Sequence, residues 1–93
     1  MKNKITQDKI EKYKKLTKTA LKIVEVSIIK GKGKQAKEII NMAKNYLFDA
    51  NYFQKKQDFV NSFAAINYAH GWIDSGVRLG IFNVKDNKLF TVK

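Results

Sequence analysis

Apolar residues recur every three or four positions through three long stretches of the chain, and that spacing predicts three α-helices. The first stretch covers residues 6–29, with Thr6 as its N-cap and lysines on the face away from the apolar one. Its end, residues 24–29, is rich in β-branched side chains and could also form a strand. Because the helical spacing continues into this end unbroken, we predict one helix over 6–29.

A break of sequence Lys-Gly-Lys-Gly at residues 30–33 separates the first helix from the second. Gly31 suits the left-handed conformation that follows a helix, and the adjacent lysines complement the C-terminal end of the helix dipole. A phosphate-binding loop is an alternative, but the Walker pattern is missing and no strand is predicted before it. The spacing after the break predicts a second helix over residues 34–54.

The third helix is predicted over residues 58–79, with Asp58 as its N-cap and Gly80 as its stop. A glycine inside a helix costs about 1 kcal/mol relative to alanine, so Gly76 needs a compensating contact. It lies with small residues on one side of the apolar stripe, where we expect a neighbouring helix to approach closely. Gly71 lies on the solvent side, where packing gives it no role. The stripe itself consists of Phe59, Phe63, Ile66, His70, Ile73 and Val77.

The tail, residues 81–93, contains two short apolar runs on either side of a turn-prone Lys-Asp-Asn-Lys segment. A small hairpin is one interpretation, but isolated hairpins are marginally stable in water. We favour an extended tail that lays its apolar side chains on the bundle or on a partner. These side chains are Ile81, Phe82, Leu89 and Phe90. The predicted fold is all-α: an up-and-down antiparallel three-helix bundle with an extended C-terminal tail, in a single domain over residues 1–93.

The composition excludes several classes of site. The chain has no cysteine and one histidine, so disulfides and the usual structural zinc sites are excluded. No apolar run approaches the roughly 18 residues of a transmembrane helix, and the N-terminal segment is too polar for a secretory signal. We therefore expect a cytoplasmic protein with no membrane attachment and no cofactor.

Positive charge is concentrated in the first half of the chain. The formal charge is +11; residues 1–44 carry 13 lysines against four acidic residues, or +9, and residues 45–93 carry the remaining +2. These lysines form either a solvated face or a contact for a polyanion. Nucleic-acid binding requires that the candidate lysines share a face. The candidates are Lys12, Lys15, Lys22, Lys30, Lys32, Lys34 and Lys37.

Tyrosine rings that are exposed within a basic groove could also stack on single-stranded bases. The four tyrosines are Tyr13, Tyr46, Tyr52 and Tyr68. Only Tyr13 lies inside the lysine-rich segment, and its spacing from Ile10 and Leu16 indicates a core position. We therefore rank stacking below the other uses of this surface.

His70, Asp74 and Arg78 are spaced four residues apart and so lie along one face of the third helix. A histidine beside a carboxylate can serve acid–base catalysis, but no nucleophile or metal-ligand motif accompanies it. His70 lies within the apolar stripe, so we prefer a core polar network in which Asp74, Asp49 or a tyrosine of the second helix bonds the ring. A ligand site and a catalytic site are the alternatives. The candidate polar cluster is Asp49, Asn67, His70, Asp74 and Arg78.

Two segments of the chain resemble a known family. Residues 46–53 read Tyr-Leu-Phe-Asp-Ala-Asn-Tyr-Phe, and residues 58–80 end in Tyr-Ala-His-Gly-Trp-Ile-Asp-Ser-Gly-Val-Arg-Leu-Gly. Both are similar to an uncharacterised archaeal family, the domain of unknown function 357. The resemblance covers the second and third helices, and the first only in length and pattern. It implies an up-and-down three-helix bundle in an archaeal cytoplasm, with no established activity, cofactor or catalytic residue.

Three functions are compatible with this sequence, and we rank a non-enzymatic protein-interaction module first. Such a module would dock an unidentified protein partner through the tail and residues 68–78, and an exposed apolar patch at Phe82–Phe90 would support it. The alternative is a nucleic-acid-binding accessory protein that uses the lysines of the first helix and the following loop. A ligand-binding or catalytic site at His70, Asp74 and Arg78 comes last and requires an open pocket at His70.

Overall fold

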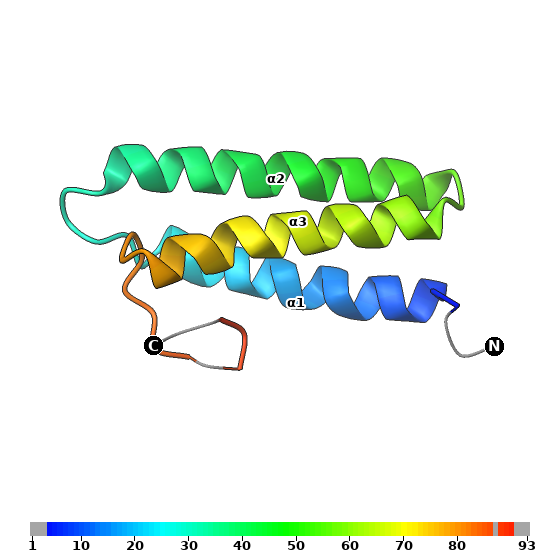
Figure 1. The fold of residues 1–93 in the computed structure, drawn as a ribbon, viewed down its shortest axis with the longest axis horizontal. Helices are drawn as coiled ribbons and strands as arrows, with labels where there is room; N and C mark the ends of the chain where they lie inside the picture. Colours follow the sequence, from blue (N-terminus) through cyan, green and yellow to red (C-terminus); the bar gives the residue numbers. More distant parts are fainter. Residues whose placement is uncertain (1–3, 87, 91–93) are drawn as a thin grey trace.

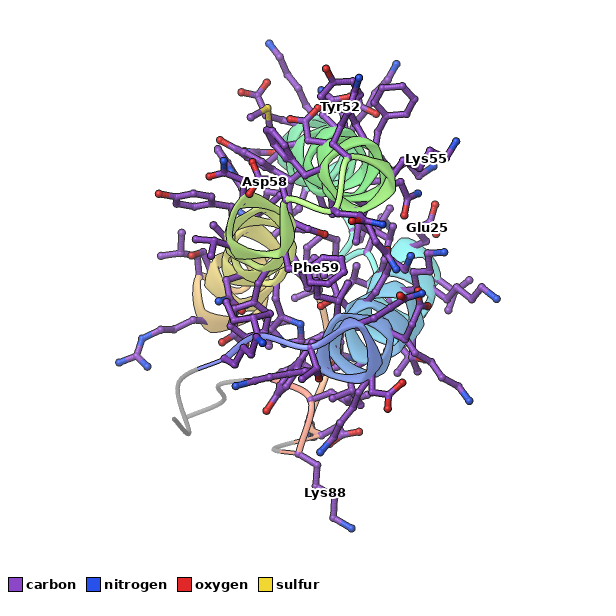
Figure 2. The ribbon with its side chains drawn as sticks, turned by 90° about the vertical axis from the view of Figure 1, so that its right-hand side faces the viewer. Glu25, Tyr52, Lys55, Asp58, Phe59 and Lys88 are labelled. Carbon is purple, nitrogen blue, oxygen red and sulfur yellow. The ribbon has the colours of Figure 1, made fainter. Side chains whose placement is uncertain are left out.

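Three long helices form the molecule in the computed structural model, which describes residues 4–86 and 88–90 (Figure 1). α1 spans Gln7–Glu25, α2 spans Gly33–Lys55 and α3 spans Phe59–Arg78. α2 runs antiparallel to α1 and α3, and viewed along their length the three helices occupy the corners of a triangle (Figure 2). The predicted all-α, up-and-down three-helix bundle is confirmed. Within the described residues, no helix is long and apolar enough to cross a membrane.

Both predicted N-caps are present. Thr6 Oγ1 accepts a hydrogen bond of 3.1 Å from the backbone N–H of Lys9, and Asp58 Oδ1 accepts one of 3.2 Å from the backbone N–H of Asn61. Each bond satisfies a backbone donor that the first turn of a helix leaves without an intrahelical partner. Local sequence therefore sets the starts of α1 and α3.

Residues in the left-handed conformation end α2 and α3. Gly80 follows α3 with a φ of +78°, as predicted, and Gln57 occupies the same position after α2 with a φ of +60°. After α3, the N–H of Ile81 donates to the carbonyl of Gly76 over 2.9 Å, which closes a Schellman motif. The observed ends of α2 and α3 differ from the predicted ends by one residue each.

α1 ends earlier than predicted. It stops at Glu25 rather than at residue 29, and Ile28 instead forms an antiparallel bridge with Phe82 of the tail. The N–H of Ile29 also donates to the carbonyl of Ile81 over 3.0 Å. The helical prediction was wrong here because β-branched residues suit extended backbone and the tail supplies hydrogen-bond partners for it.

The tail lies against the bundle, but it is not extended throughout: it begins with the bridge at Phe82 and turns at residues 88–89, where Asp86 Oδ1 accepts from the N–H groups of Lys88 and Leu89. Its buried side chains are part of the larger core cluster, so the tail completes the core. These side chains are Ile81, Phe82 and Phe90, with Leu89 half-buried beside them. The apolar patch expected at Phe82–Phe90 is therefore not exposed. Of the predicted tail, Asn87 and residues 91–93 lie outside the described part of the chain.

Gly76 is packed closely, and the tail supplies most of the contact. A Cβ atom placed on Gly76 would lie 2.5 Å from Cε2 of Phe82 and 2.9 Å from Cδ1 of Ile39 in α2. Both distances are shorter than normal carbon–carbon contacts, so a side chain at this position would displace its neighbours. The close approach predicted for Gly76 is confirmed, but a tail ring rather than a helix backbone occupies the space.

The core consists of two apolar clusters along the bundle. Two polar residues, His70 of α3 and Thr17 of α1, lie between the clusters along the bundle. In its own helix, each follows residues of the smaller cluster and precedes residues of the larger one. The larger cluster comprises Ala20, Leu21, Val24, Ala36, Ile39, Ala43, Leu47, Ala69, Ile73, Val77, Ile81, Phe82 and Phe90. The smaller cluster comprises Ile10, Ala50, Ala65 and Ile66.

Candidate functional site

His70 is held by hydrogen bonds at both ring nitrogens. Its Nε2 lies 2.7 Å from the carbonyl oxygen of Leu89 in the tail, and its Nδ1 lies 3.1 Å from Oγ1 of Thr17 in α1. A carbonyl oxygen only accepts hydrogen bonds, so Nε2 donates to Leu89, and the Thr17 hydroxyl, which can donate or accept, is the partner of Nδ1. His70 therefore ties α3 both to α1 and to the tail.

These partners differ from the predicted ones. We expected Asp74, Asp49 or a tyrosine of the second helix to bond His70, and that expectation is wrong. Sequence analysis missed Thr17, because helical periodicity shows which face of a helix is buried and not which residue lies opposite on another helix. The interpretation of His70 as a hydrogen-bonded group agrees with both contacts, but the ring is half-buried and not part of the core clusters.

A hollow of about 380 Å³ opens beside His70, between α1, α3 and the tail. Of the candidate polar cluster, Asn67, His70 and Asp74 line this hollow, whereas Asp49 and Arg78 are exposed elsewhere. The other residues that line it are Tyr13, Leu16, Thr17, Ile66, Gly71, Lys88 and Leu89. The open pocket that a ligand site at His70 requires is therefore present.

The hollow at His70 offers hydrogen-bonding groups but no available ring nitrogen. Because Thr17 and Leu89 occupy both nitrogens of His70, the ring can act as a base only after it leaves one of them. Within the described residues, no group of three or more His, Cys, Asp or Glu side chains is arranged to hold a metal ion. The geometry at His70 thus fits a structural role better than a catalytic one.

The seven candidate lysines are all exposed, but they form two groups. Lys12, Lys15 and Lys22 project from the outer face of α1, away from its buried residues. The other four lie in the α1–α2 connection and at the start of α2, where Lys34 and Lys37 point away from the buried stripe of that helix. Because α1 and α2 face the core from different corners of the triangle (Figure 2), the two groups point in different directions, and the seven lysines do not share the single face that we required of them.

Two hollows that share Lys14 lie along α1. The first, of about 430 Å³, is lined by α1 alone and reaches its outer face, and the second, of about 370 Å³, lies between α1 and α2. Lys15 and Lys22 were predicted candidates, whereas Lys18 and Lys55 were missed because the sequence does not show which flank of α2 faces α1. We refer to the lining residues as the α1–α2 furrow: Gln7, Glu11, Lys14, Lys15, Lys18, Thr19, Lys22, Asn51, Gln54 and Lys55.

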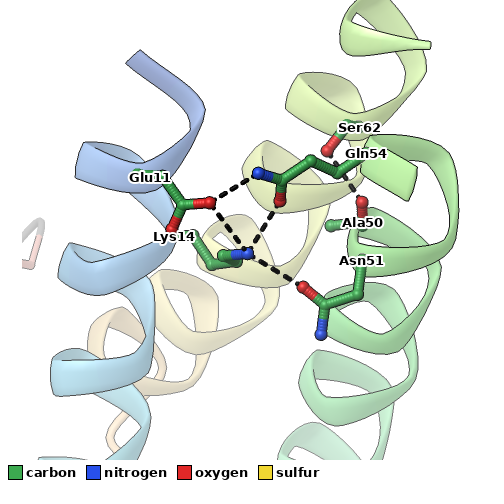
Figure 3. A network of polar contacts seen from close by, with 6 residues as sticks. All are labelled: Glu11, Lys14, Ala50, Asn51, Gln54 and Ser62. Carbon is green, nitrogen blue, oxygen red and sulfur yellow. Dashed lines mark hydrogen bonds and ion pairs between the residues drawn. The ribbon is translucent and has the colours of Figure 1, made fainter. Parts of the chain in front are cut away.

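Within the furrow, Lys14 joins α1 to α2 (Figure 3). Its ammonium donates to Asn51 Oδ1 over 3.0 Å and to Gln54 Oε1 over 2.7 Å, and it lies 3.5 Å from the carboxylate of Glu11. The side-chain amide of Gln54 donates to the same carboxylate. Since only 13 % of its side chain is exposed, Lys14 holds the helices together and is not free to bind a ligand.

The same contacts change the acidity of Glu11. The hydrogen bond from Gln54, followed by the positive charges of Lys14 and Lys18, holds the pKa of Glu11 below its ordinary value of 4.5. Glu11 is therefore ionised at neutral pH and offsets the charge of Lys14.

The carboxylate of Glu25, at the other end of α1, is also engaged. It lies 3.2 Å from Nζ of Lys44, so this ion pair again joins α1 to α2. Among the described residues, no carboxylate lies within ion-pair distance of Lys15, Lys18 or Lys22. These three residues therefore form a row of positive charge along α1 that makes no direct ion pair within the described residues, although Lys18 is close enough to Glu11 to lower the pKa of that carboxyl. We refer to them as the lysine row.

The four tyrosines divide by exposure. Tyr13 is half-buried, with its ring centroid 5.4 Å from that of Phe63, as expected for a core position. Tyr46 is half-buried as well, and its ring lies 5.3 Å from that of Tyr68. Tyr52 and Tyr68 are exposed, so these two rings meet the first requirement for stacking on bases.

Comparison with known proteins identifies a family. Residues 12–82 match the family described as "Protein of unknown function (DUF357)". Neither the curated proteins nor the solved structures contain a significant match to the chain. The family match includes most of α1, all of α2 and α3, and the start of the tail. It therefore extends to α1, where the resemblance seen in the sequence was limited to length and pattern. The chain therefore belongs to the DUF357 family.

Proposed function

We propose that this protein is a non-enzymatic binding module of the cytoplasm whose ligand is nucleic acid, held by its phosphates along the α1–α2 furrow. The observation that carries the proposal is the lysine row of Lys15, Lys18 and Lys22. These are three exposed side chains with no carboxylate within ion-pair distance among the described residues. Phosphate groups supply the negative charge that such a row lacks.

The spacing of the lysine row suits a nucleic-acid strand. At a rise of 1.5 Å per residue, Lys15 and Lys22 lie about 10 Å apart along α1, with Lys18 between them. Phosphates of one strand follow each other every 3.4 Å or so along a duplex, so the row can contact about three of them. Lysines recognise charge rather than bases, so we expect binding that is weakened by salt and largely independent of sequence.

A protein partner is the second candidate, and it was the function ranked first from the sequence. The tail cannot supply its docking surface as it stands, because Phe82 and Phe90 are buried. Of the part of α3 predicted to take part, residues 68–78, Tyr68 is a large exposed apolar side chain; Leu79, the residue that follows α3, is 76 % exposed. Tyr68 lies on α3 and Leu79 directly after it, both outside the furrow, so the two candidates can be tested separately.

Fluorescence anisotropy with labelled RNA, single-stranded DNA and duplex DNA tests nucleic-acid binding. One triple variant carries glutamine throughout the lysine row, and a matched control carries glutamine at Lys30, Lys32 and Lys34. We expect the wild type to bind with micromolar or tighter affinity at about 150 mM salt. The affinity of the lysine-row variant should be lower than that of the wild type by about tenfold or more, and should fall less steeply with salt. The control variant should lose less affinity.

Two results would contradict the proposal. Equal losses in the two triple variants would show that binding follows net charge alone and does not use the furrow. Absence of binding by the wild type at about 150 mM salt would overturn nucleic-acid binding and leave the α3 surface as the candidate. Circular dichroism of each variant establishes that its helices are intact.

A further inference from the structure

Phe48 and Tyr52 form an aromatic pair on the solvent side of α2. They are one helical turn apart, and 73 % of Phe48 and 53 % of Tyr52 is exposed. Neither side chain belongs to the two core clusters. Single exposed apolar residues are common on protein surfaces, but two large rings one turn apart leave an apolar area in water, even though one edge of the Tyr52 ring packs on Phe53 with the ring centroids 5.5 Å apart. Such an area is available to a ligand.

Positive charge lies on one side of the aromatic pair. Lys55 stands seven residues after Phe48 and so shares its side of α2, whereas Lys44, four residues before Phe48, is paired with Glu25. The ammonium of Lys56 lies 5.7 Å from the ring centroid of Tyr52. Lys55 also lines the furrow, and Figure 2 shows Lys55 and Tyr52 projecting from adjacent sides of α2. The aromatic pair thus lies on the helix that borders the furrow, next to its cationic edge.

We infer that the nucleic acid is single-stranded, with bases stacked on Phe48 and Tyr52 and phosphates held along the lysine row. This inference rests on the proposed function and names the substrate class of the same site. Exposed aromatic rings beside a positively charged groove are the combination by which proteins bind single strands with little regard to sequence. In a duplex, neighbouring base pairs cover the faces of the bases, so the two rings have no surface to stack on.

The exposed Tyr68 provides a matched comparison for this pair. Side chains four residues apart on a helix have Cβ atoms about 5–6 Å apart, which leaves room for a planar base against either ring of the Phe48–Tyr52 pair. Tyr68 is as exposed as Tyr52 and its ring packs on Tyr46 much as that of Tyr52 packs on Phe53, but it lies on α3, outside the furrow. Its removal should therefore leave strand binding unchanged.

Anisotropy with three probes measures the contribution of stacking: a single strand, a duplex of the same sequence and an abasic strand of the same length. We expect the wild type to bind the single strand more tightly than either of the others at equal salt. The affinity of the double variant Phe48→Ala, Tyr52→Ala for the single strand should fall by about tenfold or more. Its affinity for the duplex and the abasic strand, and its salt dependence, should stay at wild-type values, because no lysine is changed.

The controls separate failure of this inference from failure of the proposed function. The variant Phe48→Tyr, Tyr52→Phe keeps both rings and should bind like the wild type, as should Tyr68→Ala. If the double alanine variant binds the single strand as tightly as the wild type does, or Tyr68→Ala weakens binding equally, stacking is overturned while the lysine-row variants still test the furrow. If the wild type binds none of the probes at about 150 mM salt, the proposed function fails, and this inference with it.

Discussion

Gly71 and Gly76 lie five residues apart in α3 and have opposite surroundings. A Cβ atom at Gly76 would clash with Phe82 and Ile39, whereas a Cβ atom at Gly71 would meet nothing within 4 Å. The sequence predicted a close contact for Gly76 and no packing role for Gly71, and the structure confirms both. The sequence could not identify the contact, because Phe82 reaches Gly76 only through docking of the tail.

Alanine at these two glycines is expected to change stability in opposite directions. Gly71→Ala improves helix propensity without a clash and should raise the free energy of unfolding by about 0.5–1 kcal/mol. Gly76→Ala gains the same propensity but displaces Phe82, and should lower the free energy of unfolding by about 1–3 kcal/mol. Urea denaturation of both variants beside the wild type measures the two changes. A Gly76→Ala protein of wild-type stability would contradict the close packing.

Among the elements, local sequence determined most of the helix ends, and a distant segment changed one of them. The caps Thr6, Asp58 and Gly80 are each identifiable from their neighbours along the chain, and each is where we predicted it. The end of α1 is different, because the tail offers residues 26–29 hydrogen bonds that compete with another helical turn. Helical spacing within one segment cannot show that competition.

His70 joins three elements, so its removal is expected to lower stability. His70→Ala leaves the buried Thr17 hydroxyl and the Leu89 carbonyl without these bonds, which should cost about 1–3 kcal/mol in the free energy of unfolding. Asp49→Ala removes an exposed candidate of the same predicted cluster and should change stability by less than about 0.5 kcal/mol. Thermal and urea unfolding of the two variants test this difference, and equal stability of His70→Ala and the wild type would exclude the role assigned to the ring.

The polar contacts between α1 and α2 make the stability of the fold depend on pH. Folding lowers the pKa of Glu11 below 4.5, so the ionised carboxylate stabilises the fold above that pH. The stabilisation is lost as the pH falls through the lowered pKa of the folded state. We therefore expect Glu11→Gln to be less stable than the wild type near neutral pH, and the two stabilities to converge at pH values well below 4.5. Urea midpoints of both proteins measured across this pH range test the prediction. A difference in stability between the wild type and Glu11→Gln that does not change with pH would rule out the charge effect.

The whole molecule carries nineteen basic and eight acidic residues, for a formal charge of +11, on a bundle of 45 × 23 × 16 Å. Like charges in this excess repel one another and destabilise the compact state. Salt screens the repulsion, since the Debye length falls from about 30 Å at 0.01 M to about 8 Å at 0.15 M. We expect the Tm to rise by several degrees between these salt concentrations, as measured by calorimetry. A Tm that falls instead would mean that attractive ion pairs outweigh the repulsion.

The fold of the whole molecule was predictable, whereas the candidate site was predictable only in part. Three amphipathic helices with short connections have few ways to bury their apolar stripes, so periodicity was sufficient to predict a bundle. The flank on which α1 meets α2 depends on the packing of all three helices. For that reason the joint position of Lys18 and Lys55, and the contacts of Lys14, could not be derived from one helix at a time. The hollow at His70 also depends on the path of the tail.

The contacts of Lys14 also bear on how the furrow changes with time. Along the furrow α1 meets α2 through polar side chains whose hydrogen bonds water can replace, whereas Ala50 of α2 and Ala65 of α3 are buried members of the smaller apolar cluster. We expect α1 to open locally before the other two helices separate, so its amide hydrogens should exchange with deuterium faster than those of α3. A strand bound across α1 and α2 would oppose this opening. Slower exchange in α1 would then report that the furrow is occupied, even where no side chain has changed its position.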